Sequence, residues 1–283
     1  MTDQPHDRKG DRPAAPTQPI KLLACDLDGT LANLDGRISD ESLDAVNRAR
    51  TAGILVVVAT GRMPHLIERF LDRLDITTEP IIGAQGAMIT HRNGVVLRRL
   101  TIDPELIRQG AAIGRNHGAA IAYFTDHELI MDRPALSPEQ DTAWMGDSLR
   151  YDPDPMSQLE GDLIKIICFH PNPNAVPGLL ADMQANLGSQ ADITRSHRWF
   201  VELCAQGADK GSALAWLCQK LGIDRDEVLA IGDGGNDVSM LRWAGMSAAP
   251  ASGDPDAIAA AKWTAPPIDE HPVVAALAHF LGW

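Results

Sequence analysis

The chain has 283 residues and a formal net charge of −13, with 45% hydrophobic and 22% charged residues. This balance is typical of a globular protein, and its acidity argues against a nucleic-acid binder, which needs a basic face. A phosphate ester is not excluded, because a bound cation and a few basic side chains can reverse the local charge. The four cysteines lack CxxC spacing, which favours reduced thiols in a cytoplasmic protein.

The most apolar and the most polar segments of the chain argue against a membrane-spanning protein and against a secretory signal peptide. No apolar run is long enough to cross a membrane, so we expect no membrane association. Residues 1–19 are polar and rich in proline, with no hydrophobic signal-peptide core. We therefore expect a disordered tail over 1–19.

The first strong pattern is the apolar run Leu22–Cys25, which predicts a short buried strand and ends at the sequence DLDGT. Open α/β sheets bind ligands at the carboxyl ends of their strands, and alternation would place Asp26 and Asp28 on one side. Two neighbouring carboxylates repel unless a cation or a shared proton compensates them. Mg²⁺, a hard cation that prefers oxygen ligands, fits such a pair, although an acidic Asp-Gly turn is the alternative interpretation.

Strands and helices alternate in the next part of the chain. The apolar spacing predicts helices over 41–52 and 63–74 and strands over 54–58 and 80–82. Such alternation is typical of a parallel sheet with right-handed crossovers. The same pattern resumes with a helix over 210–221, a strand over 228–231, a helix ending near 243, a short strand around 263 and a closing helix that reaches 281.

Between these two parts the pattern changes to one rich in hairpins. We expect a hairpin over 87–100 around Asn93-Gly94, helices over 104–117 and 176–187, and strands over 119–124, 128–131, 164–169, 190–195 and 199–204. Residues 132–160 give no clear pattern. The mixture predicts an α+β domain inserted at 84–198 into a core domain made of 20–83 and 199–283.

Thr60-Gly61-Arg62 follows a predicted buried strand and precedes a predicted helix. A hydroxyl and free amide groups at such a place can cradle a phosphate, although Thr-Gly is also an ordinary turn and helix cap. Arg62 either helps to bind the anion or covers the first helical turn.

Two later segments also carry charge at helix starts. Lys210 opens a helix, where a cation opposes the helix dipole; this favours a nearby anion, although a solvated lysine is the alternative. In GDGGND a strand ends at Asp233, two glycines permit a tight turn, and Asn236 and Asp237 open a helix. The alternative is a capped turn in which Asp237 only complements the dipole.

Taken in order, DLDGT, TGR, DKGSAL and GDGGND resemble the four motifs of the haloacid dehalogenase (HAD) superfamily. The resemblance runs from about residue 20 to the end, and Cof-type, sugar-phosphatase-like members with a large cap after the second motif are the most similar. It implies an α/β fold, with a Rossmann-like parallel-sheet core and an inserted α+β cap. It also implies a Mg²⁺-dependent phosphoric monoester hydrolase.

The resemblance also assigns roles to residues. Asp26 would be the nucleophile and Asp28 the general acid and base. Mg²⁺ would be held by the Asp26 carboxylate, the Asp28 backbone carbonyl and Asp233. The phosphate group would be bound by residues from the other three motifs: Thr60, Gly61, Lys210 and Asn236. Asp237 would support Lys210 or a metal-bound water, and Arg62 would lie beside the phosphate site.

The chain departs from the Cof-type pattern at three places. Gln85-Gly86-Ala87 stands where relatives have Asn-Gly-Ala. The stretch 248–252 lacks an asparagine that supports the phosphate site in relatives, and His271-Pro272-Val273 replaces Asp-Gly-Val. These departures lie outside the four motifs, but they weaken the transfer of any particular relative's substrate.

The resemblance implies a small phosphorylated metabolite as the substrate, of the class of sugar phosphates or related metabolites, and names no single compound. A phosphomutase or phosphotransferase would use the same residues but accumulate an isomeric ester rather than inorganic phosphate. A non-catalytic metabolite-binding protein would have lost Asp26 or Asp28.

We expect the insert to select the leaving group. Polar and aromatic side chains of its kind are more often solvated or packed than ligand-binding. The candidates are His127, Arg195, His197, Arg198 and Trp199. The sequence predicts no oligomeric state.

Overall fold

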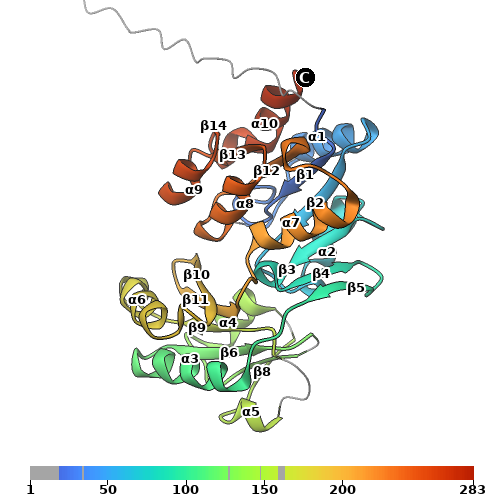
Figure 1. Cartoon of the computed structure of the whole chain (residues 1–283). Coiled ribbons are helices and arrows are strands. Elements are labelled where there is room, and N and C mark those ends of the chain that lie inside the picture. Colours follow the sequence, from blue (N-terminus) through green and yellow to red (C-terminus); the bar gives the residue numbers. More distant parts are fainter. Residues whose placement is uncertain (1–18, 34, 127, 147, 159–162) are drawn as a thin grey trace, which may run out of the picture.

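The computed structural model describes residues 19–33, 35–126, 128–146, 148–158 and 163–283 (Figure 1). The tail expected over 1–19 lies, except for Pro19, outside these residues. An eight-stranded sheet has the order β14-β13-β12-β1-β2-β3-β4-β5, and a six-stranded sheet has the order β10-β11-β9-β6-β7-β8. We call the first sheet and its helices the core, and the elements from Pro104 to Ala205 the cap.

Six neighbouring strands of the core sheet run parallel, as the alternation of strands and helices predicted. They are β1 (Leu22–Cys25), β2 (Leu55–Ala59), β3 (Pro80–Gly83), β12 (Val228–Ile231), β13 (Met246–Pro250) and β14 (Trp263–Ala265). The antiparallel strands β4 (Met88–His91) and β5 (Val96–Arg99) extend one edge. The expected Rossmann-like core sheet is thereby confirmed.

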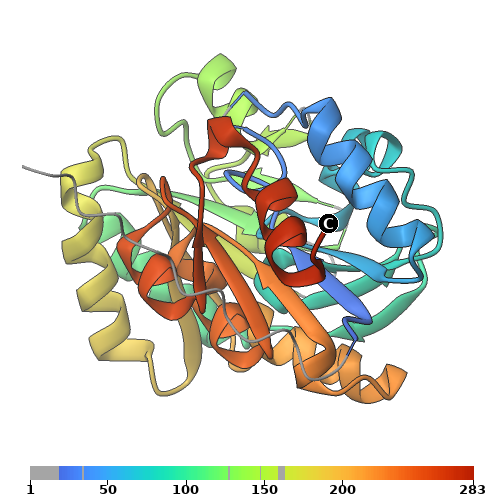
Figure 2. The ribbon, with the colours of Figure 1, turned by 90° about the horizontal axis from the view of Figure 1, so that it is seen from above.

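Helices cover both faces of this sheet, because alternate residues of each buried strand point to opposite sides. Leu23 and Cys25 pack with the helices of one face, and Leu22 and Ala24 pack with those of the other. Figure 2 shows α1 in blue and α7 in orange on opposite sides of the strands. The first face carries α1 (Asp40–Thr51), α2 (Glu68–Arg73) and α10 (Pro272–Leu281), and the second carries α7 (Lys210–Leu221), α8 (Val238–Trp243) and α9 (Pro255–Ala260).

The cap sheet is mainly antiparallel and packs against two long helices, α3 (Pro104–Asn116) and α6 (Val176–Leu187). Its strands are β6 (Ala120–Phe124), β7 (Leu129–Met131), β8 (Leu149–Tyr151), β9 (Lys165–Phe169), β10 (Ala191–His197) and β11 (Phe200–Ala205). The stretch without a clear sequence pattern contains α4 (Pro138–Met145), β8 and α5 (Pro155–Gln158). None of the helices in the described ranges has the length and apolarity needed to cross a bilayer.

Sheet membership differs from the expected bounds of the insert at two places. The β4–β5 hairpin, which we expected in the insert, belongs to the core sheet, because the short helix η2 (Ala84–Gly86) turns the chain back beside β3. Strand β11, which we expected in the core, pairs with β9 and β10 in the cap sheet. The division into two domains stays a prediction.

The helix predicted over 63–74 is split in the structure. Pro64 disfavours a helical conformation for the preceding residue, and Met63 is extended with ψ of 141°. A single 3₁₀ turn, η1 (Pro64–Leu66), follows, and α2 starts only at Glu68. The apolar spacing predicted the correct buried residues, but not the continuous helix.

The cap and the core share one hydrophobic cluster. Met63, Ala84 and Met88 of the core are buried in the same cluster as residues of β6, β9 and β11. The apolar packing of the cap therefore continues into the core at Met63, η2 and β4.

Candidate active site

Strand β1 delivers Asp26 to the α7 side of the core sheet. Leu22 and Ala24 face α7 and α8, and alternation carries that side onward to Asp26. Lys210, the first residue of α7, has its Nζ 2.6 Å from Asp26 Oδ1 and 2.6 Å from Asp237 Oδ1. All three side chains are buried. The cation that opposes the helix dipole is thus held by two carboxylates.

Strand β12 lies beside β1 and brings Asp233 to the same edge of the sheet. The Thr30 hydroxyl donates to Asp233 Oδ1 at 2.9 Å. Gly29 has φ of +90°, and a Cβ at this position would lie 2.4 Å from Asp233 Oδ2, so only glycine fits here. One oxygen each from Asp26, Asp233 and Asp237 lie within 4.8 Å of one another.

The carboxylates of this cluster hold more negative charge than Lys210 can offset. Burial raises the pKa of Asp26 well above its usual value; Lys210 opposes the shift, and the carboxylates of Asp237 and Asp233 add to it. Burial, together with Asp237, raises the pKa of Asp233 to about 6. Burial opposes the charge of Lys210, but Asp237 and Asp26 outweigh it and raise the lysine pKa. A hard divalent cation with oxygen ligands fits this donor set.

Asp28 has different surroundings from Asp26, although only one residue separates them. Arg62 Nε and Nη2 donate to the two oxygens of Asp28 at 2.7 and 2.8 Å. The Asp28 side chain is 43% exposed and is not part of the cluster of Asp26, Asp233 and Asp237. Arg62 therefore contacts a carboxylate instead of only covering a helical turn.

Thr60 and Gly61 lie directly after β2, and Thr60 is buried. The Arg62 amide donates to Thr60 Oγ1 at 3.1 Å. A Cβ on Gly61 would lie 2.5 Å from Gln85 Nε2, so glycine permits the close approach of this amide. Gln85 has a left-handed backbone with φ of 60°, and its Oε1 accepts from Asn236 Nδ2 at 2.9 Å. Gln85 therefore links the second motif to the fourth.

Residues 23–277 match the family model of haloacid dehalogenase-like hydrolases. The chain belongs to this family. It is 28% identical over 262 residues to the putative phosphatase YxeH of Bacillus subtilis, covering 91% of this chain and 97% of that protein. It is 31% identical over 229 residues to HMP-PP phosphatase of Cronobacter sakazakii, covering 80% of this chain and 82% of that protein.

A solved structure of a HAD subclass IIB sugar phosphatase has a TM-score of 0.78 and 25% identity to this HAD hydrolase, covering 92% of this chain and 98% of that chain. The expected family, fold class and type of enzyme, a HAD-type phosphatase, are thereby confirmed. The roles of the individual residues stay predictions.

The cap of this HAD hydrolase places basic groups opposite Asp233. A cavity of about 330 Å³ between the β10–β11 hairpin and the fourth motif is lined by Arg195, His197 and Arg198 on the cap side. Arg195 donates to Asp254 at 2.9 Å. Burial and the charge of Arg198 lower the pKa of His197. Three of the five insert residues considered above thus line a cavity next to the candidate site.

The other two insert candidates do not line this cavity. Trp199 packs edge-on against Phe169, with ring centroids 6.0 Å apart. His127 lies outside the described residues. Packing is therefore the role that the structure supports for Trp199.

Sequence reasoning missed two charged cap residues beside the site, Lys165 on β9 and Glu202 on β11. Their side chains are only 2% and 3% exposed, and their charged atoms lie 2.5 Å apart. Lys165 Nζ also donates to the Gly61 carbonyl at 2.8 Å. A single charge inside an apolar strand, as in IKIICF and FVELCA, was the signal that could have revealed them.

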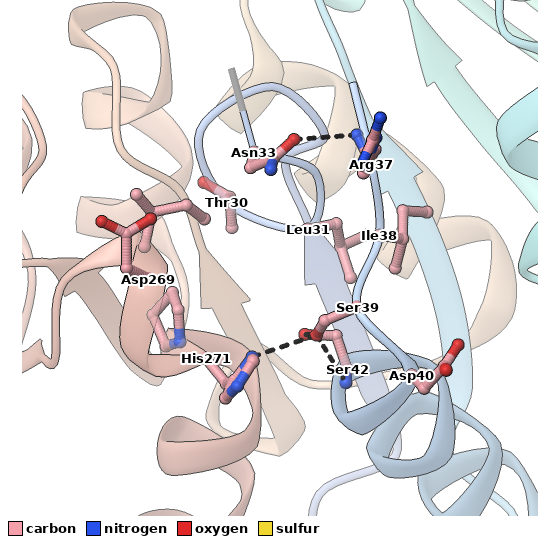
Figure 3. A pocket seen from close by; sticks show the side chains of 12 residues that line it. Thr30, Leu31, Asn33, Arg37, Ile38, Ser39, Asp40, Ser42, Asp269 and His271 are labelled. Carbon is pink, nitrogen blue, oxygen red and sulfur yellow. Dashed lines mark hydrogen bonds between the residues drawn. The ribbon is translucent and has the colours of Figure 1, made fainter. Parts of the chain in front are cut away.

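A second cavity, of about 380 Å³, lies between the loop after the first motif and the segment before α10 (Figure 3). His271 Nδ1 lies 3.0 Å from Ser39 Oγ, and His271 has a left-handed backbone with φ of 55°. Thr30 lines this cavity, but the described residues around it include none of the candidate catalytic carboxylates. We therefore do not assign the reaction to this cavity.

Proposed function

We propose that this phosphatase depends on Mg²⁺ and hydrolyses small phosphate monoesters, such as sugar phosphates or related metabolites, through an aspartyl-phosphate on Asp26. One observation carries the proposal: the buried Asp26 carboxylate is held by Lys210 at a strand end, next to Asp233. A candidate nucleophile, a counter-charge and a candidate metal ligand therefore lie close together, which supports the proposal.

Asp26, Asp233 and the Asp28 backbone carbonyl would hold the metal. Bound there, Mg²⁺ would offset the repulsion between the nucleophile and an anionic phosphoryl group. Asp237 also belongs to the carboxylate cluster, but its Oδ1 accepts from Lys210 and its Oδ2 accepts from the Gly234 amide at 2.9 Å. We assign Asp237 to the orientation of Lys210.

In the first half of the reaction, Asp26 attacks phosphorus and the bond to the ester oxygen breaks. Asp28 gives its proton to the departing oxygen. In the second half, the Asp28 carboxylate takes a proton from water, and the water oxygen attacks phosphorus. The bond to Asp26 then breaks, inorganic phosphate leaves, and Asp28 holds a proton again.

Residues around the phosphoryl group stabilise its charge. The Thr60 hydroxyl and the Lys210 ammonium are the donors that we expect to face its oxygens. Asn236 uses one amide hydrogen for Gln85, and its second hydrogen remains available to a phosphoryl oxygen.

The substrate class is supported by the relatives and by the cavity. The matched proteins include an HMP-PP phosphatase and a sugar phosphatase, both of which act on small molecules. The cavity beside Asp233 has arginine and histidine side chains on its cap side, which suit a polar or anionic leaving group. The leaving group would thus lie between the cap and the core.

Phosphate release from a panel of sugar, nucleotide and cofactor phosphates, with Mg²⁺ present, tests the proposal. We expect kcat/KM of at least about 10⁴ M⁻¹s⁻¹ on one class of small ester, within the usual range of enzymes. Accumulation of an isomeric ester without free phosphate would instead indicate a phosphomutase. Tight ester binding without turnover would indicate a metabolite-binding protein.

A further inference from the structure

A lysine of the cap reaches into the phosphate-binding loop of the core. Lys165 Nζ donates to the Gly61 carbonyl oxygen at 2.8 Å, and Glu202 Oε2 lies 2.5 Å from the same nitrogen. The lysine also lies 4.9 Å from the ring of Phe124, another cap residue. The backbone of the second motif is thus held by a side chain that is 104 residues distant in sequence.

The planar peptide unit transmits this contact to Thr60. In a trans peptide the carbonyl of Gly61 and the amide N–H of Arg62 point in opposite directions. Lys165 holds the carbonyl end, and the amide end donates to Thr60 Oγ1 at 3.1 Å. Because the hydroxyl oxygen already accepts this bond, the Thr60 O–H is directed elsewhere and can donate to a phosphoryl oxygen.

Glu202 connects the same contact to the other side of the site. Its Oε1 accepts from Gln85 Nε2 at 2.8 Å and from the Ser196 hydroxyl. Gln85 in turn accepts from Asn236. Thr60 and Asn236, which we expect on two sides of the phosphate, are therefore both tied to one buried ion pair of the cap. Such a pair is weak evidence for stability, and a network with these partners favours a positioning role.

We propose that Lys165 is a positioning residue for the phosphoryl group, acting through the Gly61–Arg62 peptide on the Thr60 hydroxyl. The phosphate site is then complete only while the cap rests on the core. This inference builds on the proposed phosphatase function, and it extends the expected role of the cap beyond selection of the leaving group.

Two variants that differ only at position 165 test the proposal. Glu202→Gln keeps the shape of the side chain but has one oxygen in place of two, so it can accept from Lys165 or from Gln85 Nε2 and not from both. The double variant Lys165→Met/Glu202→Gln has a side chain of similar length at 165 but no donor for the Gly61 carbonyl, and it leaves no buried carboxylate without its lysine. The readouts are the inhibition constant of inorganic phosphate, and KM and kcat for a small aryl phosphate and a sugar phosphate, at saturating Mg²⁺.

We expect the double variant to bind inorganic phosphate about 10-fold more weakly than Glu202→Gln, as for the loss of a charged hydrogen bond. The loss in kcat/KM should be the same for both esters, because they share the phosphoryl group. Equal phosphate binding by the two variants, or a loss confined to one leaving group, would overturn the proposal.

Arg115→Met is the matched control. It breaks another cap ion pair, in which Arg115 Nε lies 2.8 Å from an Asp132 carboxylate that is 4% exposed and Arg115 also donates to Tyr123 of the cap. This variant should lower stability and leave phosphate binding unchanged. If the double variant does not fold, Lys165→Gln in the Glu202→Gln background replaces it, because glutamine is polar but one atom too short, and the same loss is expected.

Calorimetry separates the failure of this inference from the failure of the proposed function. If the wild-type protein releases no phosphate from any ester, the proposed function fails. Binding of inorganic phosphate to the Mg²⁺-loaded wild-type and variant proteins still measures the effect of Lys165. A 10-fold difference between the two variants would support the positioning role, and equal affinities would overturn it.

Discussion

Asp26 and Asp28 are two apart in sequence and have opposite environments. Asp26 is buried against Lys210, whereas Asp28 is partly exposed and makes a bidentate contact with Arg62. When two carboxylates have different surroundings, they can perform different steps of one reaction. In the proposed reaction, Asp26 at the strand end is the nucleophile, and the partly exposed Asp28 serves the departing oxygen and the incoming water.

Asp28→Asn tests the acid and base role. Asparagine cannot transfer a proton, so turnover of a sugar phosphate should fall about 10²–10⁴-fold. An aryl phosphate needs little protonation of its leaving group, so it should still phosphorylate Asp26 and then stall. Rapid-quench measurement should show a burst of aryl alcohol close to one per enzyme. Equal losses on both esters without a burst would contradict the assignment.

Asp233→Asn tests the candidate metal ligand. The amide can still accept from Thr30 but lacks the negative charge, so the Mg²⁺ concentration for half-maximal activity should rise at least about 10-fold. Asp226→Asn, which removes a charge from a side chain that is 67% exposed, is the control and should change nothing. An unchanged Mg²⁺ requirement in Asp233→Asn would remove this residue from the metal site.

The sequence predicted the site residues that belong to local motifs, but not those that depend on docking of the cap. Asp26, Thr60 and Lys210 each follow a strand or open a helix, so short-range pattern places them. Lys165 and Glu202 lie beside the site only because the cap sheet contacts the second motif. Nothing in the local sequence shows which loop their charges will meet.

The N-terminal cap of helix α7 positions Lys210, the first residue of the helix. Asp209 is the N-cap residue, and its Oδ1 accepts from the Ser212 amide at 2.9 Å. Burial alone would raise the pKa of Asp209, but hydrogen bonds from the Ser212 hydroxyl and amide outweigh it and lower that pKa. The N-cap residue Asp209 therefore fixes the start of α7, where the candidate active-site lysine Lys210 lies.

Asp209→Ala should lower the free energy of unfolding by about 1 kcal/mol at pH 7, as is usual for a lost N-cap. Because the folded pKa lies below the usual 3.8, the charge-dependent stabilisation is present above that pH and is lost as the pH falls through the folded value. Denaturant unfolding at pH 7 and pH 3 measures both effects. Asp209→Asn keeps an acceptor without the charge, so its difference from wild type should shrink at low pH; a difference that grew would contradict this account.

Two elements near the end of the chain were not predicted, for a reason visible in their composition. Strand β13 reads MSAAP and helix α9 reads PDAIAA, and such small residues give almost no apolar periodicity. Strand β13 forms because β12 and β14 pair with it on both sides. By contrast, β1, β2 and β12 are continuous apolar runs, and their strands were predicted within one residue.

At the scale of the whole molecule, an acidic protein places several of its basic residues beside the proposed site. Although the net charge is −13, two basic residues contact the candidate catalytic carboxylates, namely Lys210 and Arg62. Two more line the cavity next to the fourth motif, namely Arg195 and Arg198. The buried network of Lys165 and Glu202 then joins the cap to the same region. Binding of an anion should therefore stabilise both parts together.

Mg²⁺ and inorganic phosphate should stabilise the fold cooperatively. A ligand that binds only the folded state at 100 times its Kd adds about 2.7 kcal/mol. Phosphate should bind well only when a cation offsets the cluster of Asp26, Asp233 and Asp237, so its effect on Tm should be small in chelator and larger with Mg²⁺. Differential scanning calorimetry of the four combinations measures this, and equal phosphate shifts with and without Mg²⁺ would argue against a shared site.

The most direct test of the central claim is release of inorganic phosphate from a small aryl phosphate by wild-type protein and by Asp26→Asn. Wild-type turnover should vanish in chelator and return with Mg²⁺. The folded variant, verified by circular dichroism, should be slower by at least about 10³-fold, because it lacks the carboxylate that forms the covalent intermediate. A folded Asp26→Asn protein that releases phosphate at close to the wild-type rate would show that Asp26 is not the nucleophile.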